Sequence, residues 1–401
     1  MITQELKVLL LSLRDWHEAG RLPRAFRRAG FQVAALAFPG LLITRSRDVQ
    51  SLVMLPEGGT QAELIDAIRS GVEAAAPTLV VPTDDAAVEW LQAVALTARR
   101  ELPPGAPLLR LLQDSLGEFR HHATLLDRKL MAAVTESCGV RAPQFVVAHE
   151  HKDALAFAEQ HGLPVVLKAE ESAGGYGVAI CRDLPSLSSA LSRFGGVAGK
   201  HLRAGLLVQG FVAGPTAMRA VMAWRGQVLS GLSGIKRETH PFPTSPSSVV
   251  EFIEHEEMRN SARILVAELG FSGLASLDFQ LDAEGKAHLI EFNPRPTPIC
   301  HLGEVLGRDL CQCLADTLRG QSVQDIEAPN LPRTVALFPQ EWARNAESPH
   351  LTSAYHDVPW DDPDLLEASV AIARGQRRFN AMMTQEHRRE PLRAFLSSDE
   401  P

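Results

Sequence analysis

Acidic residues recur within one stretch of the chain that ends in an arginine, Leu274 to Arg295. It contains two runs of alternating apolar and polar residues around a short polar turn, which is typical of a β-hairpin. If residues 283–286 form a four-residue loop, Asp278 lies directly across from Glu291, with their Cβ atoms about 5 Å apart. Two carboxylates at that separation repel each other unless a cation lies between them.

The oxygen atoms on this face of the hairpin describe a site for a hard cation. Asn293 follows Glu291 on the same face and adds a neutral oxygen, and the same alternation assigns Leu289 to that face. Oxygens of Asp, Glu and Asn suit Mg²⁺ and leave room for phosphate oxygens. Arg295 then supplies a forked positive charge that suits an anion. The alternative is a solvated hairpin with ordinary surface charges, so the rest of the chain has to decide.

A lysine and a glycine-rich segment earlier in the chain add groups that bind phosphate. Lys168 ends an apolar strand over residues 163–168, and a lysine that points into a cleft usually has an anionic partner. The next segment reads ESAGGYGVAI, in which Gly174, Gly175 and Gly177 allow a loop whose N–H groups close around phosphate. It is not a P-loop, because GxxxxGK[ST] is absent. We expect a hairpin flap over a ligand, and a plain hairpin turn is the alternative.

The elements that must position these groups begin with an alternation of strands and helices. Apolar runs predict four strands, and apolar stripes at helical spacing predict the helices between them. The strands are expected at residues 7–13, 31–38, 51–55 and 78–82, and the helices at 16–29, 60–72 and 86–98. This order predicts a right-handed parallel α/β sheet. No GxGxxG follows the first strand, so a dinucleotide site is not expected.

Three polar residues, Thr83, Asp84 and Asp85, stand where the fourth strand ends and a helix begins. The simpler interpretation is a helix N-cap. The functional interpretation is a contact at the rim of a ligand site, because ligands bind at the carboxyl ends of strands in open α/β sheets.

Breaks in the pattern divide the chain into three predicted parts. A Pro/Gly-rich stretch, ELPPGAP, begins at residue 101, and we place the first boundary near residue 118. The parts are an α/β domain over residues 1–117, a two-lobed α+β domain over 118–320, and an extension over 321–401 packed on the core. In the second part, a nucleotide lobe covers about 124–208 and a metal lobe about 209–320. A helix over residues 122–137 carries Lys129.

The order of these motifs resembles the ATP-grasp superfamily. Lys129, then PVVLK with AGGYG, then LVQGFVAG, then LDFQLDAEGKAHLIEFNPR follow one another as in its carbamoyl-phosphate-synthase-like and amino-acid ligase groups. The resemblance covers roughly residues 118–315, and the first domain is similar to the pre-ATP-grasp domain of such enzymes. It implies a parallel α/β pre-ATP-grasp domain followed by a two-lobed α+β ATP-grasp domain.

The resemblance also implies roles for individual residues. Those that bind ATP are the phosphate contacts Lys129 and Lys168, the covering loop with Ser172, Gly174, Gly175 and Gly177, and the adenine hinge Gln209, Phe211 and Val212. Those that act on the transferred group are Lys168 and Arg295, and those that hold two Mg²⁺ are Asp278, Glu291 and Asn293. Mn²⁺ could substitute for Mg²⁺ at such a site.

Two positions depart from the family. Gln209 stands where the family often has Glu, and the amide keeps the hydrogen-bond acceptor while it loses the charge. Thr216 stands where an acidic contact to the ribose often follows the hinge, which leaves the ribose contact open. Neither departure affects the predicted metal residues.

The composition excludes other classes of protein. A net charge of −8 in 401 residues argues against a general nucleic-acid binder. No apolar run reaches the length of a membrane span. Five cysteines at irregular spacing fit reduced thiols better than a zinc site, so we expect a cytoplasmic location.

Together these features predict an ATP-dependent carboxylate–amine (or thiol) ligase that forms an acyl phosphate and releases ADP and phosphate. Its partners would be ATP, a small carboxylate and an amine acceptor, and a homodimer is compatible with the sequence. One alternative is an enzyme that forms carbamate or carboxyphosphate, and another is a catalytically silent nucleotide-binding regulatory protein. Candidates for the acceptor side are Lys236, Arg237, His240, Thr297, Cys300 and His301, with solvated surface residues as the alternative.

Overall fold

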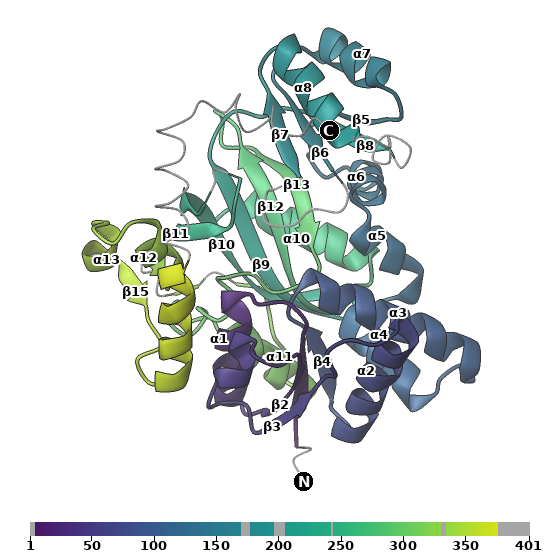
Figure 1. Cartoon of the computed structure of the whole chain (residues 1–401), viewed down its shortest axis with the longest axis vertical. Coiled ribbons are helices and arrows are strands. Elements are labelled where there is room, and N and C mark those ends of the chain that lie inside the picture. The colour runs from purple at the N-terminus through teal and green to yellow at the C-terminus, as the bar shows by residue number, and fades with distance from the viewer. Residues whose placement is uncertain are drawn as a thin grey trace, which may run out of the picture.

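The first part of the chain forms a parallel sheet with helices on both faces. A computed structural model describes residues 5–169, 177–195, 205–241, 244–326, 328–329 and 334–375. The strands of this sheet are β1 (Lys7–Ser12), β2 (Gln32–Ala37), β3 (Ser51–Met54) and β4 (Leu79–Pro82), in the order β3-β2-β1-β4. All three pairings are parallel, as predicted. The strand order reverses between β1 and β4, because β2 and β3 follow on one side and β4 lies on the other (Figure 1).

Helices connect these strands close to the predicted positions. They are α1 (His17–Arg28), α2 (Gln61–Ala75), α3 (Asp85–Glu101) and α4 (Pro107–Leu116), with a 3₁₀ turn η1 (Leu42–Arg45) before β3. Thr60 and Glu63 form a capping box that starts α2. Asp84 caps α3 by accepting a hydrogen bond from the Ala87 N–H at 2.9 Å, which confirms the N-cap interpretation for that residue.

The predicted helix over residues 122–137 is interrupted. A 3₁₀ turn η2 (Phe119–His121) leads into α5 (His122–Leu126), and α6 (Arg128–Ser137) follows after one residue. That residue, Asp127, accepts hydrogen bonds from the backbone N–H groups of Lys129 and Leu130. An acid at this position is a strong N-cap, so the chain starts a new helix there instead of continuing the first.

A four-stranded antiparallel sheet forms the next unit. Its strands are β5 (Phe145–Ala148), β6 (Val165–Lys168), β7 (Val178–Cys181) and β8 (Leu206–Gly210), in the order β5-β8-β6-β7. Helices α7 (His151–His161) and α8 (Leu184–Gly195) pack on it, with Phe157, Leu167 and Leu187 buried in a shared core. The hairpin of β6 and β7 is the predicted flap.

A seven-stranded sheet carries the acidic hairpin. Its strands are β9 (Thr216–Trp224), β10 (Gln227–Thr239), β11 (Ser247–Ile253), β12 (Gly273–Leu281), β13 (Ala287–Asn293), β14 (Thr334–Leu337) and β15 (Tyr355–Asp357), in the order β13-β12-β9-β10-β11-β14-β15. Helix α10 (Glu256–Glu268) packs on one face through Met258 and Leu265. Helix α11 (Leu310–Leu318) packs on the other, in a core that continues into β1 and α1 through Val8 and Phe26. The first sheet therefore has no separate core at this junction.

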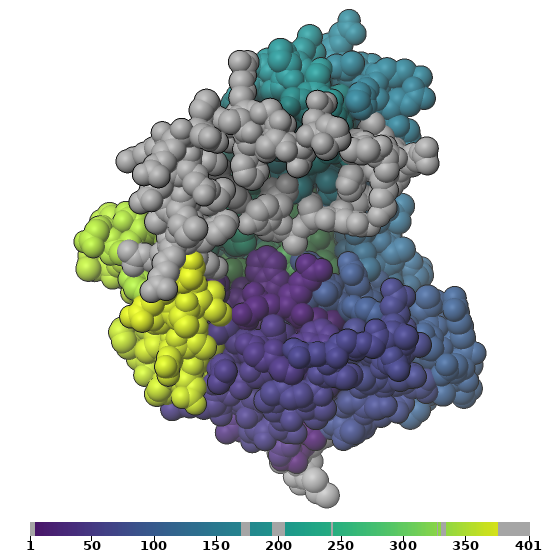
Figure 2. All heavy atoms as spheres, viewed as in Figure 1, coloured from purple at the N-terminus to yellow at the C-terminus, as the bar shows by residue number. Residues whose placement is uncertain are grey.

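The end of the described chain returns to the first part. Short helices α12 (Gln340–Arg344) and α13 (His350–Ser353) precede β15, and a helix over residues 363–375 follows it. Figure 2 shows this last segment in yellow beside the purple N-terminal unit. Asp362 accepts hydrogen bonds from Ser46 and from the Arg47 N–H, and Arg21 pairs with Asp357 at 2.6 Å.

The fold class agrees with the prediction: a parallel α/β unit is followed by two lobes built on sheets that are antiparallel except for the pairing of β14 with β15. The domain boundaries near residues 118 and 321 stay a prediction. None of the helices within the described ranges is long and apolar enough to cross a bilayer.

Candidate functional site

The hairpin of β12 and β13 sets its two acids side by side. Asp278 is paired with Glu291, and Ser276 with Asn293, as the sequence predicts. The loop is one residue longer than expected, since Leu281 pairs with Ala287. A β-bulge restores the register, because one extra residue in β13 separates the pair formed by Leu289 from that formed by Glu291.

The bulge falls at Ile290 and changes which side chains share a face. Leu289 and Phe292 are both buried in the core on the α10 side of the sheet. The prediction that Leu289 shares the face of Glu291 is therefore wrong. A strict two-residue period cannot cross a bulge, since the extra residue reverses the alternation.

Each acid of the pair is matched by a cation from another element. The Lys236 Nζ atom lies 2.9 Å from Asp278 Oδ2, and both side chains are mostly buried. The Arg128 Nη2 atom lies 2.8 Å from Glu291 Oε1, and its Nε also donates to that oxygen at 3.1 Å. Burial alone would raise the pKa of Glu291, but Arg128 and Lys168 outweigh it and lower that pKa to about 2. Glu291 is therefore held as a carboxylate beside Asp278.

Lys168 ends β6 as predicted and reaches across to the bulge. It is buried, and its ammonium donates to the carbonyl oxygen of Ile290 at 2.6 Å. Burial lowers its pKa to about 8, even though the nearby Glu291 carboxylate favours the charged form. The bulge thus supplies the carbonyl oxygen that anchors this lysine beside the acid pair.

Arg128 is a member of the site that the sequence interpretation missed. Its guanidinium donates to Glu291 and to the carbonyl oxygen of Ala169, so it joins α6, the end of β6 and β13. The neighbouring Lys129, which was predicted to contact the ATP phosphates, has its Nζ 3.8 Å from Asp127 Oδ2, and its phosphate contact stays a prediction. Adjacent residues in a helix point about 100° apart, so the two side chains leave α6 in different directions. The adjacent Arg128 and Lys129 in the first turn of α6 were the feature of the sequence that could have indicated this role.

The predicted adenine hinge begins at the end of β8 and continues past it. Gln209 is buried and pairs in register with Phe145 and Val166 on the two flanking strands. Phe211 donates its backbone N–H to Pro164 at 3.2 Å, and its ring lies 5.9 Å from the Arg182 guanidinium. Half-buried Val212 comes next in the chain.

The base of the flap is a regular hairpin. The carbonyl oxygen of Gly177 accepts a hydrogen bond from the Ala169 N–H at 2.8 Å, and Lys168 pairs with Val178. Ser172, Gly174 and Gly175 lie outside the described residues. Thr216, at the open ribose position, accepts a hydrogen bond from Gln280 at 2.8 Å, so its hydroxyl is tied to the acidic hairpin.

Arg295 lies where the acidic hairpin meets the N-terminal unit. Its Nε donates to Asp85 Oδ1 at 2.7 Å, and its guanidinium stands 5.1 Å from the centroid of the Trp16 ring. Burial by itself would lower the arginine pKa, but Asp85 outweighs it and the net shift is upward. Asp85 thus binds Arg295 and Asp84 serves as the cap, while a ligand contact at this rim stays a prediction.

The residues considered for the acceptor side are dispersed. Lys236 pairs with Asp278, Arg237 pairs with Glu251 at 2.6 Å, and His301 contacts Asp357 at 2.7 Å. Cys300 is buried, which raises its pKa to about 11 and opposes a thiolate. A cavity of about 560 Å³ lies at the far end of the hairpin, lined by residues including Arg141 and Lys286 and by none of the predicted site residues.

Comparisons with known proteins point to one superfamily. The family described as "Carbamoyl-phosphate synthase L chain, ATP binding domain" matches residues 127–223. A D-alanine–D-alanine ligase of Neisseria meningitidis serogroup B is 25% identical over 187 residues, which are 44% of this chain and 59% of that protein. The chain thus spans less than two thirds of this relative.

Solved structures agree with this match. The biotin carboxylase domain dimer of a Hydrogenobacter thermophilus 2-oxoglutarate carboxylase, in complex with MgADP, ADP and bicarbonate, has a TM-score of 0.59 at 17% identity, over 82% of this chain and 72% of that one. An L-amino acid ligase from Bacillus licheniformis has a TM-score of 0.54 at 19% identity, over 83% and 79%. At such identities the likeness concerns the fold. The family match, the relative and these folds all indicate the ATP-grasp superfamily, to which the chain is similar.

Proposed function

We propose that this protein is an ATP- and Mg²⁺-dependent ligase that joins a carboxylate to an amine, or to a thiol, through an acyl phosphate. The observation that carries the proposal is the register that sets Asp278 opposite Glu291, with Lys168 and Arg128 beside them. The names of two similar proteins, a D-alanine–D-alanine ligase and an L-amino acid ligase, support carboxylate–amine ligation.

The acidic hairpin fits a hard cation that shares phosphate oxygens. Asp278 and Glu291 face each other, and the amide of Asn293 is one pair further along. Two carboxylates and an amide leave coordination positions that phosphate oxygens would complete. Lys236 and Arg128 balance the two acids in the protein by itself. Bound Mg²⁺, for which we propose two ions and Mn²⁺ as a substitute, would neutralise phosphate charge.

The chain's own residues would then align the reacting groups. An oxygen of the substrate carboxylate attacks the γ-phosphorus, the bond to the β-phosphate oxygen breaks, and ADP leaves. Lys168, Arg128 and Arg295 neutralise the oxygens of the transferred group, with Lys129 as a further phosphate contact. The amine then attacks the acyl carbon, phosphate leaves with the C–O bond electrons, and the amine loses a proton.

The rest of the nucleotide is assigned to the hinge and the flap. Gln209, Phe211 and Val212 would bind adenine, chiefly through backbone groups. The loop with Gly177 at its base, and with Ser172, Gly174 and Gly175, would cover the phosphates. A cover of this kind excludes water, which would hydrolyse the acyl phosphate. We place the reaction in the cytoplasm, without nucleic acid or membrane as partner and compatible with a homodimer.

A second candidate is an enzyme that forms carboxyphosphate or carbamate. The observation that favours it is the similarity to a biotin carboxylase domain whose complex contains bicarbonate. A silent regulatory protein is disfavoured, because both acids and the cations around them are present and paired.

Release of ADP in the presence of pooled amino acids and small carboxylates tests the proposal. Turnover that needs both a carboxylate and an amine supports the ligase. Turnover that needs only bicarbonate supports the second candidate. AMP as product contradicts the acyl-phosphate route, and saturable ATP binding without turnover under any mixture supports the regulatory alternative.

The substitution Glu291→Gln tests the acid pair directly. Loss of one carboxylate removes a metal ligand and should lower kcat by about 100-fold or more while the fold persists. The matched control is Glu257→Gln, which removes an acid that also pairs with an arginine, Arg141, at 2.8 Å but lies outside the proposed site. Equal activity in the two variants would contradict the metal role of Glu291.

A further inference from the structure

The Arg295 guanidinium occupies a distinctive place in the N-terminal sheet. Its two contacts there are Trp16, which caps the start of α1 after β1, and Asp85, which begins α3 after β4. The strand order reverses between these two strands. In open parallel sheets this reversal opens a crevice at the carboxyl ends of the strands, where ligands usually bind. Here an arginine from the other sheet enters it.

The two contacts hold the guanidinium from different directions. Asp85 accepts from Nε along the edge of the group at 2.7 Å, and Trp16 lies against its face at 5.1 Å. Nη1 donates to the carbonyl oxygen of Pro296 at 3.3 Å. Among the residues that the structure describes, no hydrogen-bond partner of Nη2 is found. The contacts therefore fix the plane of the fork and leave one terminal nitrogen for a ligand.

Without these two contacts the Arg295 side chain would lose its fixed orientation. An arginine side chain carries roughly 2 kcal/mol of rotamer entropy, so a long unclamped side chain spends little time in one orientation. Arg295 is only 8% exposed, and no other acid is recorded within ion-pair distance of it in the described residues. Asp85 and Trp16 are thus the side chains that contact its guanidinium most closely.

We propose that Asp85 and Trp16 are positioning residues that orient Arg295 toward the phosphoryl group transferred from ATP. This inference rests on the proposed function, since it assumes that Arg295 meets that group. The N-terminal unit would then contribute two residues to the phosphoryl-transfer site. The competing explanation is an ordinary ion pair that merely fastens the two units together.

The chain offers a matched control for that explanation. Arg225, in the turn between β9 and β10, pairs with Asp114 of α4 at 2.7 Å, the same length as the Arg295–Asp85 bond. It also joins the N-terminal unit to the seven-stranded sheet, but it is exposed and belongs to no proposed site. Asp114→Asn therefore removes a fastening of the same kind without touching Arg295.

The test measures binding of ADP with Mg²⁺, with and without fluoroaluminate, which mimics the transferred phosphoryl group. In Asp85→Asn, we expect the affinity gained from fluoroaluminate to fall by about 10-fold, since misplacement by about 1 Å can cost that much or more. In the same variant, the affinity for ADP without fluoroaluminate should change by less than about twofold. In Asp114→Asn, both the ADP affinity and the gain from fluoroaluminate should stay within about twofold of the wild type. Trp16→Leu should resemble Asp85→Asn, while Trp16→Phe, which keeps an aromatic face, should retain most of the gain.

Turnover gives a second readout. With the substrates found in the ADP-release assay, Asp85→Asn should lower kcat by about 10- to 100-fold and leave the KM for ATP within about threefold. Equal behaviour of Asp85→Asn and Asp114→Asn in the fluoroaluminate assay would overturn the inference. A wild-type protein that gains no affinity from fluoroaluminate would instead overturn the proposed phosphoryl transfer, and this inference with it.

Discussion

At the scale of single residues, burial and nearby charge set the properties of the ionisable groups around the site. Glu18 is the clearest case. It lies in the first turn of α1, is only 2% exposed, and its Oε1 has no hydrogen-bond partner in the described structure. Burial raises its pKa from 4.5 to about 7, and the positive charge of Arg295 only partly opposes the shift. The folded protein therefore favours the protonated carboxyl.

This raised pKa predicts a pH dependence of stability. The unfolded chain releases the proton near pH 4.5 and the folded protein near pH 7. The contribution of the group is therefore fully present below pH 4.5 and is lost as the pH rises through 7. The loss is about 3 kcal/mol at most.

Glu18→Gln tests this dependence, because the amide cannot ionise. We expect the free energy of unfolding of the variant to change less than that of the wild type between pH 5 and 8. At pH 8 the variant should be the more stable of the two. Urea unfolding at several pH values measures both quantities, and parallel pH profiles for the two proteins would show that Glu18 is ionised throughout.

At the scale of elements, short backbone features decide where side chains meet. The bulge in β13 brings Asp278 and Glu291 into register and presents the Ile290 carbonyl to Lys168. Gly214, between the hinge and β9, allows a similarly close approach. A Cβ atom there would lie 1.8 Å from the carbonyl oxygen of Leu281, at the end of β12.

Gly214→Ala should therefore displace the end of the acidic hairpin. Its φ of 142° and the backbone clash leave no room for a side chain, so we expect a loss of more than about 2 kcal/mol of unfolding free energy. Gly139→Ala is the control, because it has a φ of 68° but no atom within 4 Å, and it should cost about 1 kcal/mol. Denaturant unfolding measures the free energy of unfolding of both variants. Similar losses would mean that the positive φ, and not the backbone clash, sets the cost of the substitution.

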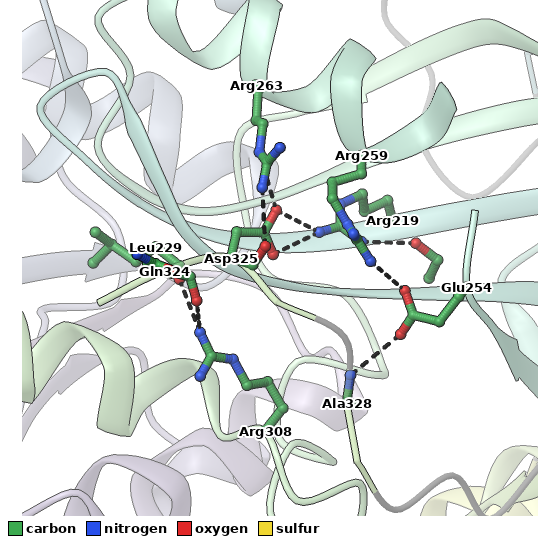
Figure 3. A network of polar contacts seen from close by, with 10 residues as sticks. Arg219, Leu229, Glu254, Arg259, Arg263, Arg308, Gln324, Asp325 and Ala328 are labelled. Atoms are coloured by element: carbon green, nitrogen blue, oxygen red, sulfur yellow. Dashed lines mark hydrogen bonds and ion pairs between the residues drawn. The ribbon is translucent and has the colours of Figure 1, made fainter. Parts of the chain in front are cut away.

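At the scale of the whole molecule, a buried ion-pair network ties the connection after α11 to the large sheet (Figure 3). Arg219 of β9 pairs with Asp325 at 2.8 Å, and both side chains are 1% exposed. Arg263 of α10 also approaches Asp325, and Ser233 accepts a hydrogen bond from Arg219. The network lies on the α10 side of the sheet, opposite the acid pair, so we expect it to support stability.

Removal of one partner should be more harmful than removal of both. Arg219→Met leaves Asp325 buried with less compensation and should cost about 3–5 kcal/mol, whereas Arg219→Met with Asp325→Leu should recover much of that loss. Arg141→Met breaks an exposed pair and should cost less than about 1 kcal/mol. Urea unfolding measures the free energy of unfolding of these three variants. A double variant as unstable as the single one would show that packing dominates here.

The sequence pattern predicted elements better than contacts. The four parallel strands, the β6–β7 hairpin and the acidic hairpin appear close to their predicted positions, because each has a strong local periodicity. The break at Asp127 and the bulge at Ile290 were missed. The break depends on the hydrogen bonds of Asp127, and the bulge depends on how β13 pairs with β12. Neither can be predicted from the spacing of apolar residues.

By itself, the sequence determined the chemical inventory of this protein: paired acids, an amide, lysines and an arginine in a set order along alternating strands. Only the tertiary structure decided which of them meet. It placed Arg128 in contact with Glu291, and joined Arg295 to Asp85, 210 residues earlier in the chain. Periodicity reports which face of an element is apolar, whereas contacts between distant charges depend on how the sheets pack, which no local pattern records.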